Sequence, residues 1–204
     1  MEIFKLFQNR RQVRHFLKDE YPDESLVKDL IDKTFEVVPS KQNLFPYSVK
    51  VIGPDPKNDT YRSELYELSK HTNTMQNTNC FAPYNLIFTS RLAFPIADWT
   101  VRSWKAGQPF DQFDIDKYKD SGALRFAAIE VGMFTSIFSA LCLSHNINIG
   151  YMLCFPAEEE KWNKLDFIGD EKVFFVMSLG YRDHTKMIRS GEEKPEKDEV
   201  IEWI

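Results

Sequence analysis

The sequence predicts a single domain of the α+β or mixed α/β class, in which helices cover a β-sheet. Helical and strand-like segments follow one another in the order helix, helix, strand, helix, strand, helix, strand, helix, strand. The length of 204 residues fits one domain, which we expect to span residues 1–204. Hydrophobic residues make up 43% of the chain and aromatic residues 14%, which is enough for a sizeable core and argues against disorder.

The first half of the chain contains clear start and stop signals. A short helix with an apolar side opens the sequence, and a second begins at Pro22 and Asp23, which are typical helix-start residues. This helix ends before Pro39, and residues 46–52 then alternate apolar and polar side chains, as a half-buried strand does. Two elements follow: a helix over 59–70 and a strand over 84–90.

The second half begins with an irregular excursion over 91–121, where tryptophan, phenylalanine, proline and glycine interrupt any regular period. We expect this excursion to act as a lid, a pocket wall or a packing arm. A charged tail over 182–204 ends in the apolar sequence VIEWI, which indicates that it docks on another surface. Four elements lie between them: a long helix over 122–145, a strand over 147–155, a surface helix over 157–166 and a strand over 172–181.

The bulk composition disfavours several function classes. A net charge of −5 argues against a general nucleic-acid binder, and only 8 glycines argue against a glycine-rich phosphate loop. The three cysteines form no C-x-x-C pair and the four histidines are scattered, so no metal site is expected. The odd number of cysteines fits a reducing, cytoplasmic location.

No secretion signal or membrane span is expected. The N-terminal stretch MEIFKLFQNRRQVRHF has no apolar region followed by a small-residue cleavage site. The run FAAIEVGMFTSIFSALCL over 126–143 is long enough to cross a membrane, but Glu130 lies inside it and its flanks lack an anchor pattern. A buried core helix is therefore the better interpretation.

Two polar segments carry more hydrogen-bonding groups than the fold needs. Arg10, Arg11 and Arg14 place three guanidinium groups close together, and guanidinium is a planar fork suited to phosphate or to a carbonyl-rich ring edge. The loop PSKQN over 39–43 offers serine and asparagine donors and acceptors on short stems. Taken alone, the first segment also fits a solvated cationic face, and the second an ordinary helix stop.

Two further segments complete the candidate site. The long helix carries small residues along an almost wholly apolar surface, which would let a second subunit pack against part of it. The strand NINIGYMLCF over 146–155 contains Gly150, where a ligand could approach the backbone. The tail adds three cations that either pair with an anion or remain surface charge: Lys186, Arg189 and Lys194.

Taken in order, these features resemble the nitroreductase family of FMN-dependent enzymes. The family segment R-R-S/D-x-R-x-F is similar to RRQVRHF over 10–16, and the loop A-P-S-x-x-N-x-Q-P-W to VPSKQNLFPY over 38–47. The strand G-L-G-T-x-W-M-G-G-F is similar to NINIGYMLCF, and the ending L-G-Y-P to LGYR over 179–182, which a basic tail follows. The long helix is the fifth feature in this order. No single feature is specific, but the five together are fairly specific. The resemblance is weakest over 54–120.

The resemblance implies a three-layer α+β fold in which helices flank a central, mostly antiparallel sheet. It also implies a homodimer with FMN at the interface and a C-terminal arm, at about 182–204, exchanged between subunits. The residues that it assigns to FMN are Arg10, Arg11, Gln12, Arg14, Pro39, Ser40, Asn43, Gly150, Met152, Leu153, Arg189 and Lys194. The residues that it assigns to the substrate pocket are Lys41, Phe94, Trp99, Trp104 and Phe110.

Within this set, the first arginines and the tail cations would neutralise a phosphate that carries about two negative charges. Ser40 and Asn43 would contact the flavin ring, and in one arrangement Asn43 would come from the second chain of the dimer. Arg14 or Lys41 would place a cation near the N1–C2=O edge of the flavin. No catalytic side chain is assigned, because the flavin performs the redox chemistry. The implied activity is reduction of a small planar acceptor (a nitroaromatic, quinone or enone) with NADH or NADPH by a ping-pong mechanism.

Three departures from the family pattern bear on this activity. Gln12 replaces a serine or aspartate, Phe45 and Tyr47 replace glutamine and tryptophan, and Leu153-Cys154 stands where the family often has Gly-Gly or Glu-Gly. Bulk at Leu153-Cys154 would narrow the space above the flavin and reduce the access of a nicotinamide. Two alternatives stay open: a family branch that consumes reduced flavin or reduces halogenated aromatics, and a non-catalytic module that keeps the fold.

Overall fold

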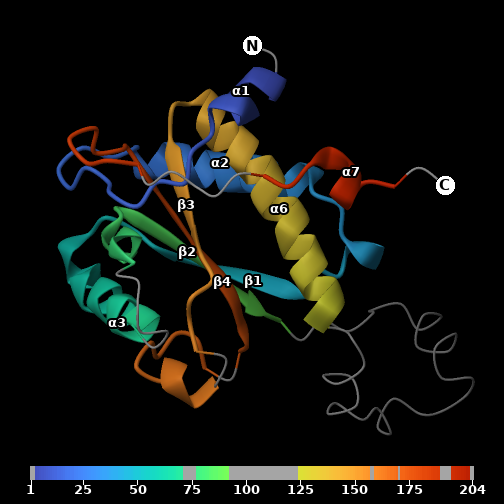
Figure 1. Cartoon of the computed structure of the whole chain (residues 1–204). Helices are drawn as coiled ribbons and strands as arrows, with labels where there is room; N and C mark the ends of the chain where they lie inside the picture. The colour runs from blue at the N-terminus through green and yellow to red at the C-terminus, as the bar shows by residue number, and fades with distance from the viewer. Residues whose placement is uncertain are drawn as a thin grey trace, which may run out of the picture.

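The structure is a computed structural model, and it describes residues 3–70, 77–91, 124–156, 159–169, 171–188 and 194–202. Its strands are β1 (Tyr47–Ile52), β2 (Tyr84–Ser90), β3 (Asn148–Met152) and β4 (Val173–Gly180). They form one sheet in the order β1-β2-β4-β3, and every neighbouring pair is antiparallel. β2 and β4 therefore occupy the middle of this sheet, and β1 and β3 lie at its edges (Figure 1).

Helices lie on both faces of the sheet. They are α1 (Ile3–Asn9), α2 (Glu24–Val37), α3 (Asp59–Ser69), α6 (Leu124–Ser144) and α7 (Lys197–Val200). α2 and α6 cover one face, and α3 lies on the other (Figure 1). This three-layer arrangement around an antiparallel sheet confirms the α+β prediction and excludes the mixed alternative for the described strands. The exchange of a C-terminal arm with a second chain stays a prediction.

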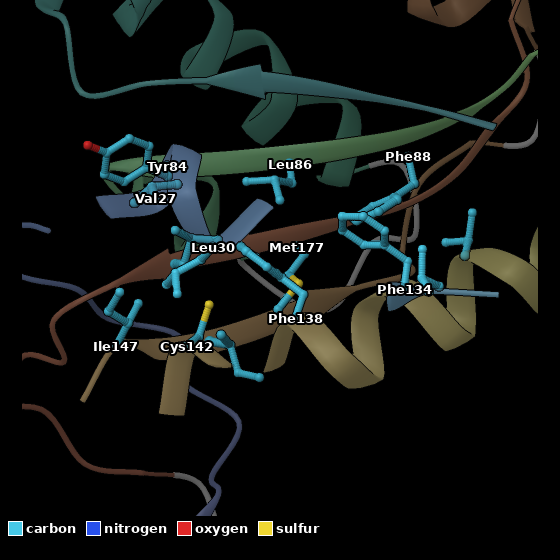
Figure 2. Close-up of a cluster of buried hydrophobic side chains, with 14 of the residues drawn as sticks. Val27, Leu30, Tyr84, Leu86, Phe88, Phe134, Phe138, Cys142, Ile147 and Met177 are labelled. Atoms are coloured by element: carbon cyan, nitrogen blue, oxygen red, sulfur yellow. The ribbon is translucent and has the colours of Figure 1, made fainter. Parts of the chain in front are cut away.

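The central strands are buried on both faces, because successive side chains of a strand point to opposite sides. Leu86 and Phe88 on β2 pack toward α2 and α6, whereas Ile87 between them packs with Leu65 of α3. The sheet is thus the middle layer of two cores. The larger core is drawn in Figure 2 and includes Val27, Leu30, Tyr84, Leu86, Phe88, Phe134, Phe138, Cys142, Ile147 and Met177.

α6 is the helix that the long apolar run predicts. By length and composition alone it could cross a membrane, and 44% of that stretch is buried inside the protein. Phe134, Phe138 and Cys142 recur every four residues on its buried side, where they pack against the sheet. This side is a core-facing surface, as the sequence predicts. The outer side exposes three large apolar side chains: Phe126, Ile129 and Met133.

One predicted helix does not form. In place of a surface helix over 157–166, the described residues there contain only a short 3₁₀ turn, η7 (Glu159–Trp162). The physical reason is the apolar spacing, since Trp162, Leu165 and Ile168 are three residues apart and all buried. The Leu165 and Ile168 N–H groups each donate to the carbonyl oxygen three residues earlier. Three-residue turns place these three side chains directly above one another in the smaller core, whereas an α-helix would spread them over about 120° of its surface.

Candidate functional site

The arginine-rich segment lies along the outer edge of β3. The Val13 N–H donates to the Ile149 carbonyl oxygen at 3.1 Å. The Gln12 side-chain amide spans the next position, where its Nε2 donates to the Tyr151 carbonyl oxygen at 2.7 Å and its Oε1 accepts the Tyr151 N–H at 3.0 Å. Gln12 thus continues the hydrogen-bond ladder with a side chain in place of backbone. A serine is too short for this role, so the departure from the family pattern at Gln12 has a structural reason.

Gly150 makes this close approach possible. A Cβ atom at this position would lie 2.2 Å from the Val13 carbonyl oxygen and 3.3 Å from Asn79 Nδ2. Real Cβ atoms essentially never come within 3.0 Å of another atom, so any other residue would push the segment away from β3. The neighbour that Gly150 admits here is the protein's own chain. A role of Gly150 toward FMN stays a prediction.

The end of β4 joins the same cluster. The Leu17 N–H donates to the Tyr181 carbonyl oxygen at 2.8 Å, and Phe16 forms an isolated antiparallel bridge with Arg182. A Cβ atom on Gly180 would lie 3.2 Å from Phe16 Cδ1, so a larger residue would crowd the phenylalanine. The fold therefore brings together three motifs that are far apart in the sequence: the arginine segment, the glycine-containing strand and LGYR.

The arginines of this cluster lie where α1 ends. Arg11 Nη1 donates to the Gln8 and Arg10 carbonyl oxygens, each at 3.0 Å, and so satisfies acceptors that the end of a helix leaves open. The Arg10 guanidinium carbon lies 5.9 Å from the centroid of the Tyr151 ring, a cation–π distance. Arg14 is half-buried farther along the segment. Arg10 and Arg11 are adjacent and reach solvent, so one anion could contact both.

The end of β3 presents an exposed apolar residue. β3 ends at Met152 rather than at the predicted position 155. Met152 is buried and its sulfur accepts a hydrogen bond from Cys80 Sγ at 3.5 Å, so only its backbone could face a ligand. Leu153 is 76% exposed, and Lys194 in the tail is exposed as well. The predicted site residues outside the described part of the chain are Arg189, Phe94, Trp99, Trp104 and Phe110.

The polar loop after α2 contains two residues in an unusual backbone conformation. Beyond Pro39 it forms the 3₁₀ turn η1 (Lys41–Asn43), and the Ser40 hydroxyl accepts the Phe45 N–H at 2.8 Å. Asn43 has a φ of +54° and Phe45 a φ of +47°. Asparagine tolerates this left-handed region, whereas a bulky residue there is an outlier that costs about 1–3 kcal/mol. Such a loop persists only where its surroundings hold it.

Contacts with α2 and with the end of β2 hold this loop. The Arg91 N–H donates to the Pro46 carbonyl oxygen at 3.0 Å, and the guanidinium donates to the carbonyl oxygens of Phe45, at 2.9 Å, and of Leu44. The Phe45 ring packs on Phe35 of α2, with 4.6 Å between the ring centroids. The ring that replaces the family's glutamine therefore anchors the loop on α2.

α6 contributes a third contact through a buried carboxylate, which in the sequence is only a break in an apolar run. Glu130 is 6% exposed, and its Oε1 accepts the Lys41 N–H at 2.9 Å. Lys41 Nζ lies 4.9 Å from the centroid of the Phe126 ring on the same helix. Burial and the nearby Glu130 charge raise the pKa of Tyr47 to about 12. The sequence does contain a signal for this contact: Glu130 is a lone acidic residue four positions before Phe134, which places it on the core-facing side of the helix.

The predicted site residues form two groups at opposite edges of the sheet. The arginine segment and Gly150 lie at β3, whereas Ser40 and Asn43 directly precede β1. With neighbouring strands about 4.8 Å apart, three strand spacings separate the two edges by roughly 14 Å. This separation argues against one compact pocket that both groups line within a single chain.

Among the described residues, we find neither a metal-binding cluster nor an activated thiol at Cys80 or Cys142. In the ranges that the structure describes, no three His, Cys, Asp or Glu side chains gather where they could hold a metal ion. Cys80 and Cys142 are buried; burial raises the pKa of the Cys80 thiol to about 12, and it also raises the pKa of the Cys142 thiol. A thiol that resists ionisation is inert as a nucleophile.

No protein-family model matches the sequence, and no curated protein matches it. Solved structures match its fold. A nitroreductase family protein from Streptococcus pneumoniae TIGR4 is 18% identical over 100% of both chains, with a TM-score of 0.64. A Staphylococcus epidermidis protein, provisionally named an NAD(P)H:FMN oxidoreductase, is 12% identical over 100% of this chain and 96% of that chain, with a TM-score of 0.71. A provisionally named nitroreductase from Exiguobacterium sibiricum, in complex with FMN, is 11% identical over 100% of this chain and 98% of that chain, with a TM-score of 0.70.

The chain has the nitroreductase fold. The match covers the whole chain, so it includes the arginine segment and the loop before β1 as well as the sheet and its helices. This likeness confirms the resemblance that the order of the motifs indicates. At identities of 11–18%, it extends to the nitroreductase fold and not to the roles of individual residues.

Proposed function

We propose that the chain is an FMN-dependent oxidoreductase that reduces a small planar acceptor with NADH or NADPH by a ping-pong mechanism. The observation that carries the proposal is the likeness, over the whole chain, to a nitroreductase-fold protein in complex with FMN. Another protein of this fold is named for NAD(P)H:FMN oxidoreductase activity. The chemistry of the residues present supports FMN, because Arg10 and Arg11 are consecutive residues of the segment beside β3, and guanidinium groups suit a phosphate.

The chain's own residues would bind and orient the cofactor. Arg10 and Arg11 would hold the phosphate, and Arg189 or Lys194 would complete its charge neutralisation. The backbone at the end of β3 would face the ring, because the Met152 side chain is turned into the core. FMN would supply the redox chemistry itself, so these residues bind and position and no side chain acts as acid or base.

A second chain would complete each site. Ser40 and Asn43 lie at the edge of the sheet opposite the arginines, so we assign their loop to the flavin of the partner chain. The Ser40 hydroxyl accepts the Phe45 N–H and so keeps its own proton to donate to the ring. The exposed apolar row on α6 and the tail residues Val200 and Ile201, 68% and 48% exposed, would be buried in this homodimer. We place this enzyme in the cytoplasm.

The absorbance spectrum of the purified protein tests the cofactor, and anaerobic titration with NADH and NADPH tests the reductant. The protein should be yellow, and each nicotinamide that serves should bleach the flavin absorbance. Steady turnover with an added quinone or nitroaromatic should then separate this activity from a branch that consumes reduced flavin. Colourless protein that fails to bind added FMN would refute the proposal and favour a non-catalytic module. Slow reduction by both nicotinamides would implicate the bulk of Leu153, which is 76% exposed at the end of β3.

A further inference from the structure

Glu130 has a role that core packing does not explain. It lies on the side of α6 that faces the sheet, and only 6% of it is exposed. Its Oε1 accepts the Lys41 N–H at 2.9 Å, whereas its Oε2 is buried without a hydrogen-bond partner among the described residues. An ionised carboxylate is costly to bury, and a carboxylate with one unsatisfied oxygen is more costly still. Replacing a buried charged group by an apolar residue of similar volume is often neutral or stabilising for a core.

Tyr47 offers the complementary group. Its ring packs edge-on against Phe134, with 6.1 Å between the centroids, and its hydroxyl is also buried with no hydrogen-bond partner in the described ranges. The hydroxyl is a donor and the unused Glu130 oxygen is an acceptor, so the two atoms match in chemistry. A water molecule between them, or a small side-chain movement, would satisfy both.

Glu130 contacts the loop that precedes β1, and Tyr47 is the first residue of β1 after this loop. Glu130 accepts the N–H of Lys41, the first residue of η1, and the Lys41 ammonium lies 4.9 Å from the ring centroid of Phe126 on the same helix. α6 therefore holds Lys41 by its main chain and by its side chain. Because Asn43 and Phe45 have left-handed backbone angles, the shape of the loop depends on such contacts.

We propose that Glu130 is a positioning residue that fixes the polar loop through the Lys41 main chain, and that Tyr47 completes its hydrogen bonding. The positioning is a property of the protein without cofactor. Its consequence rests on the proposed function, since a fixed loop would present Ser40 and Asn43 to the flavin of the partner chain. A packing role alone would be served equally well by an apolar residue of similar size.

Amide hydrogen exchange in the flavin-free protein tests the positioning directly. Glu130→Leu removes the acceptor, and exchange of the amides of residues 43–45 should accelerate by about tenfold or more. Glu130→Gln keeps an acceptor oxygen for Lys41 and should restore most of the protection. Thr135→Val is the matched control, because Thr135 lies on the same helix, is 5% exposed and donates its hydroxyl proton within the helix, to the Gly132 carbonyl oxygen. Its loop exchange should stay unchanged.

Lys41→Pro is a second test of the same hydrogen bond, and it leaves the core side chains unchanged. It tests the positioning role even if Glu130→Leu does not fold. Proline removes the N–H that Glu130 accepts, and it suits the first position of a helical turn. Ser40 has a ψ of 141°, the extended conformation that a residue before proline requires. Lys41→Ala keeps the N–H and is the matched control. Exchange in the loop should accelerate in the proline variant and not in the alanine variant.

The FMN affinity of the same variants separates this inference from the proposed function. Glu130→Leu and Lys41→Pro should raise the Kd for FMN by about tenfold, with Glu130→Gln close to the parent protein. Unchanged exchange of residues 43–45 in the folded variants would overturn the inference, whether or not the protein binds FMN. Accelerated loop exchange in a protein that binds no flavin would support the positioning role and refute the proposed function.

Discussion

Replacing Gly150 with alanine should detach the arginine segment from β3. The new Cβ atom would lie 2.2 Å from the Val13 carbonyl oxygen, whereas ordinary contacts begin at 3.4 Å, so segment and strand must separate by about 1.2 Å. The atom in the way is backbone, which cannot rotate aside as the end of a flexible side chain can. The strain must therefore be relieved by moving one chain segment away from the other.

A shift of this size breaks three hydrogen bonds. The Val13 N–H bond to Ile149, now 3.1 Å, would exceed hydrogen-bonding range, and so would the two bonds of 2.7 and 3.0 Å between Gln12 and Tyr151. At about 0.5–1.5 kcal/mol for each bond, the free energy of unfolding should fall by about 2–4 kcal/mol. For a chain of this length, that corresponds to a decrease in Tm of roughly 5–15 °C.

Urea denaturation followed by tryptophan fluorescence measures this loss. Gly53→Ala is the matched control, because the nearest atom to its new Cβ is Tyr84 Cε1 at 3.9 Å, an ordinary contact. It should change the free energy of unfolding by less than about 0.5 kcal/mol. FMN affinity should fall in the Gly150 variant only, since Arg10 and Arg11 move with the segment. A Gly150→Ala protein as stable as the control would refute the packing of this segment on β3.

Three further predictions concern other parts of the molecule. Changing Arg10 and Arg11 together to alanine should weaken FMN binding about a hundredfold in a flavin titration and leave the protein folded, because two charge-assisted contacts are lost; unchanged affinity would place the phosphate elsewhere. Deleting residues 195–204 should shift sedimentation toward the monomer, and a truncated chain that stays a stable dimer would argue against an exchanged arm. Burial holds the pKa of Tyr47 and Tyr84 at about 12 in the folded protein, whereas an exposed tyrosine ionises near pH 10. The unfolded chain releases these protons first, so the free energy of unfolding should fall between about pH 10 and pH 12, and a flat urea-denaturation profile across this window would contradict the burial of both hydroxyls.

Local sequence patterns are sufficient to predict the strands of the sheet and the helices that cover it, because the apolar residues of each element recur with the period of a strand or of a helix. β2 has the unbroken apolar stretch LIF at its centre because both its faces are covered, and α6 is apolar on its inner side because that side packs on the sheet. The prediction of a surface helix over 157–166, around Trp162, was wrong. Over so few residues, a three-residue and a 3.6-residue period place nearly the same side chains inward, and only the packing against the smaller core decides between them.

The sequence predicts candidate site residues by type and spacing, but it does not predict which residues they contact in the fold. Gln12 and Gly150 were predicted as cofactor contacts, yet each has a partner within the chain that accounts for its residue type. Glu130 was noted only as an interruption in an apolar helix. In each case the missing information is a long-range contact, which residue type and spacing do not specify. Lys41 and Glu130 are 89 positions apart, and only the packing of α6 on the sheet brings them together.

The strand order has a consequence for how the proposed site would assemble. PSKQN follows the arginines closely in sequence, but the order β1-β2-β4-β3 places the two at opposite edges of the sheet. Under the proposed function, the flavin site of a monomer would keep its phosphate-binding cations. It would lack the loop with Ser40 and Asn43, which a second chain would supply. Flavin binding and dimerisation should then be coupled, since FMN would bind the dimer more tightly than the monomer and would therefore also stabilise the dimer. Dilution of the holoprotein in gel filtration with flavin detection should release FMN as the dimer dissociates. FMN affinity that is independent of protein concentration would show that one chain suffices and that the loop serves another purpose.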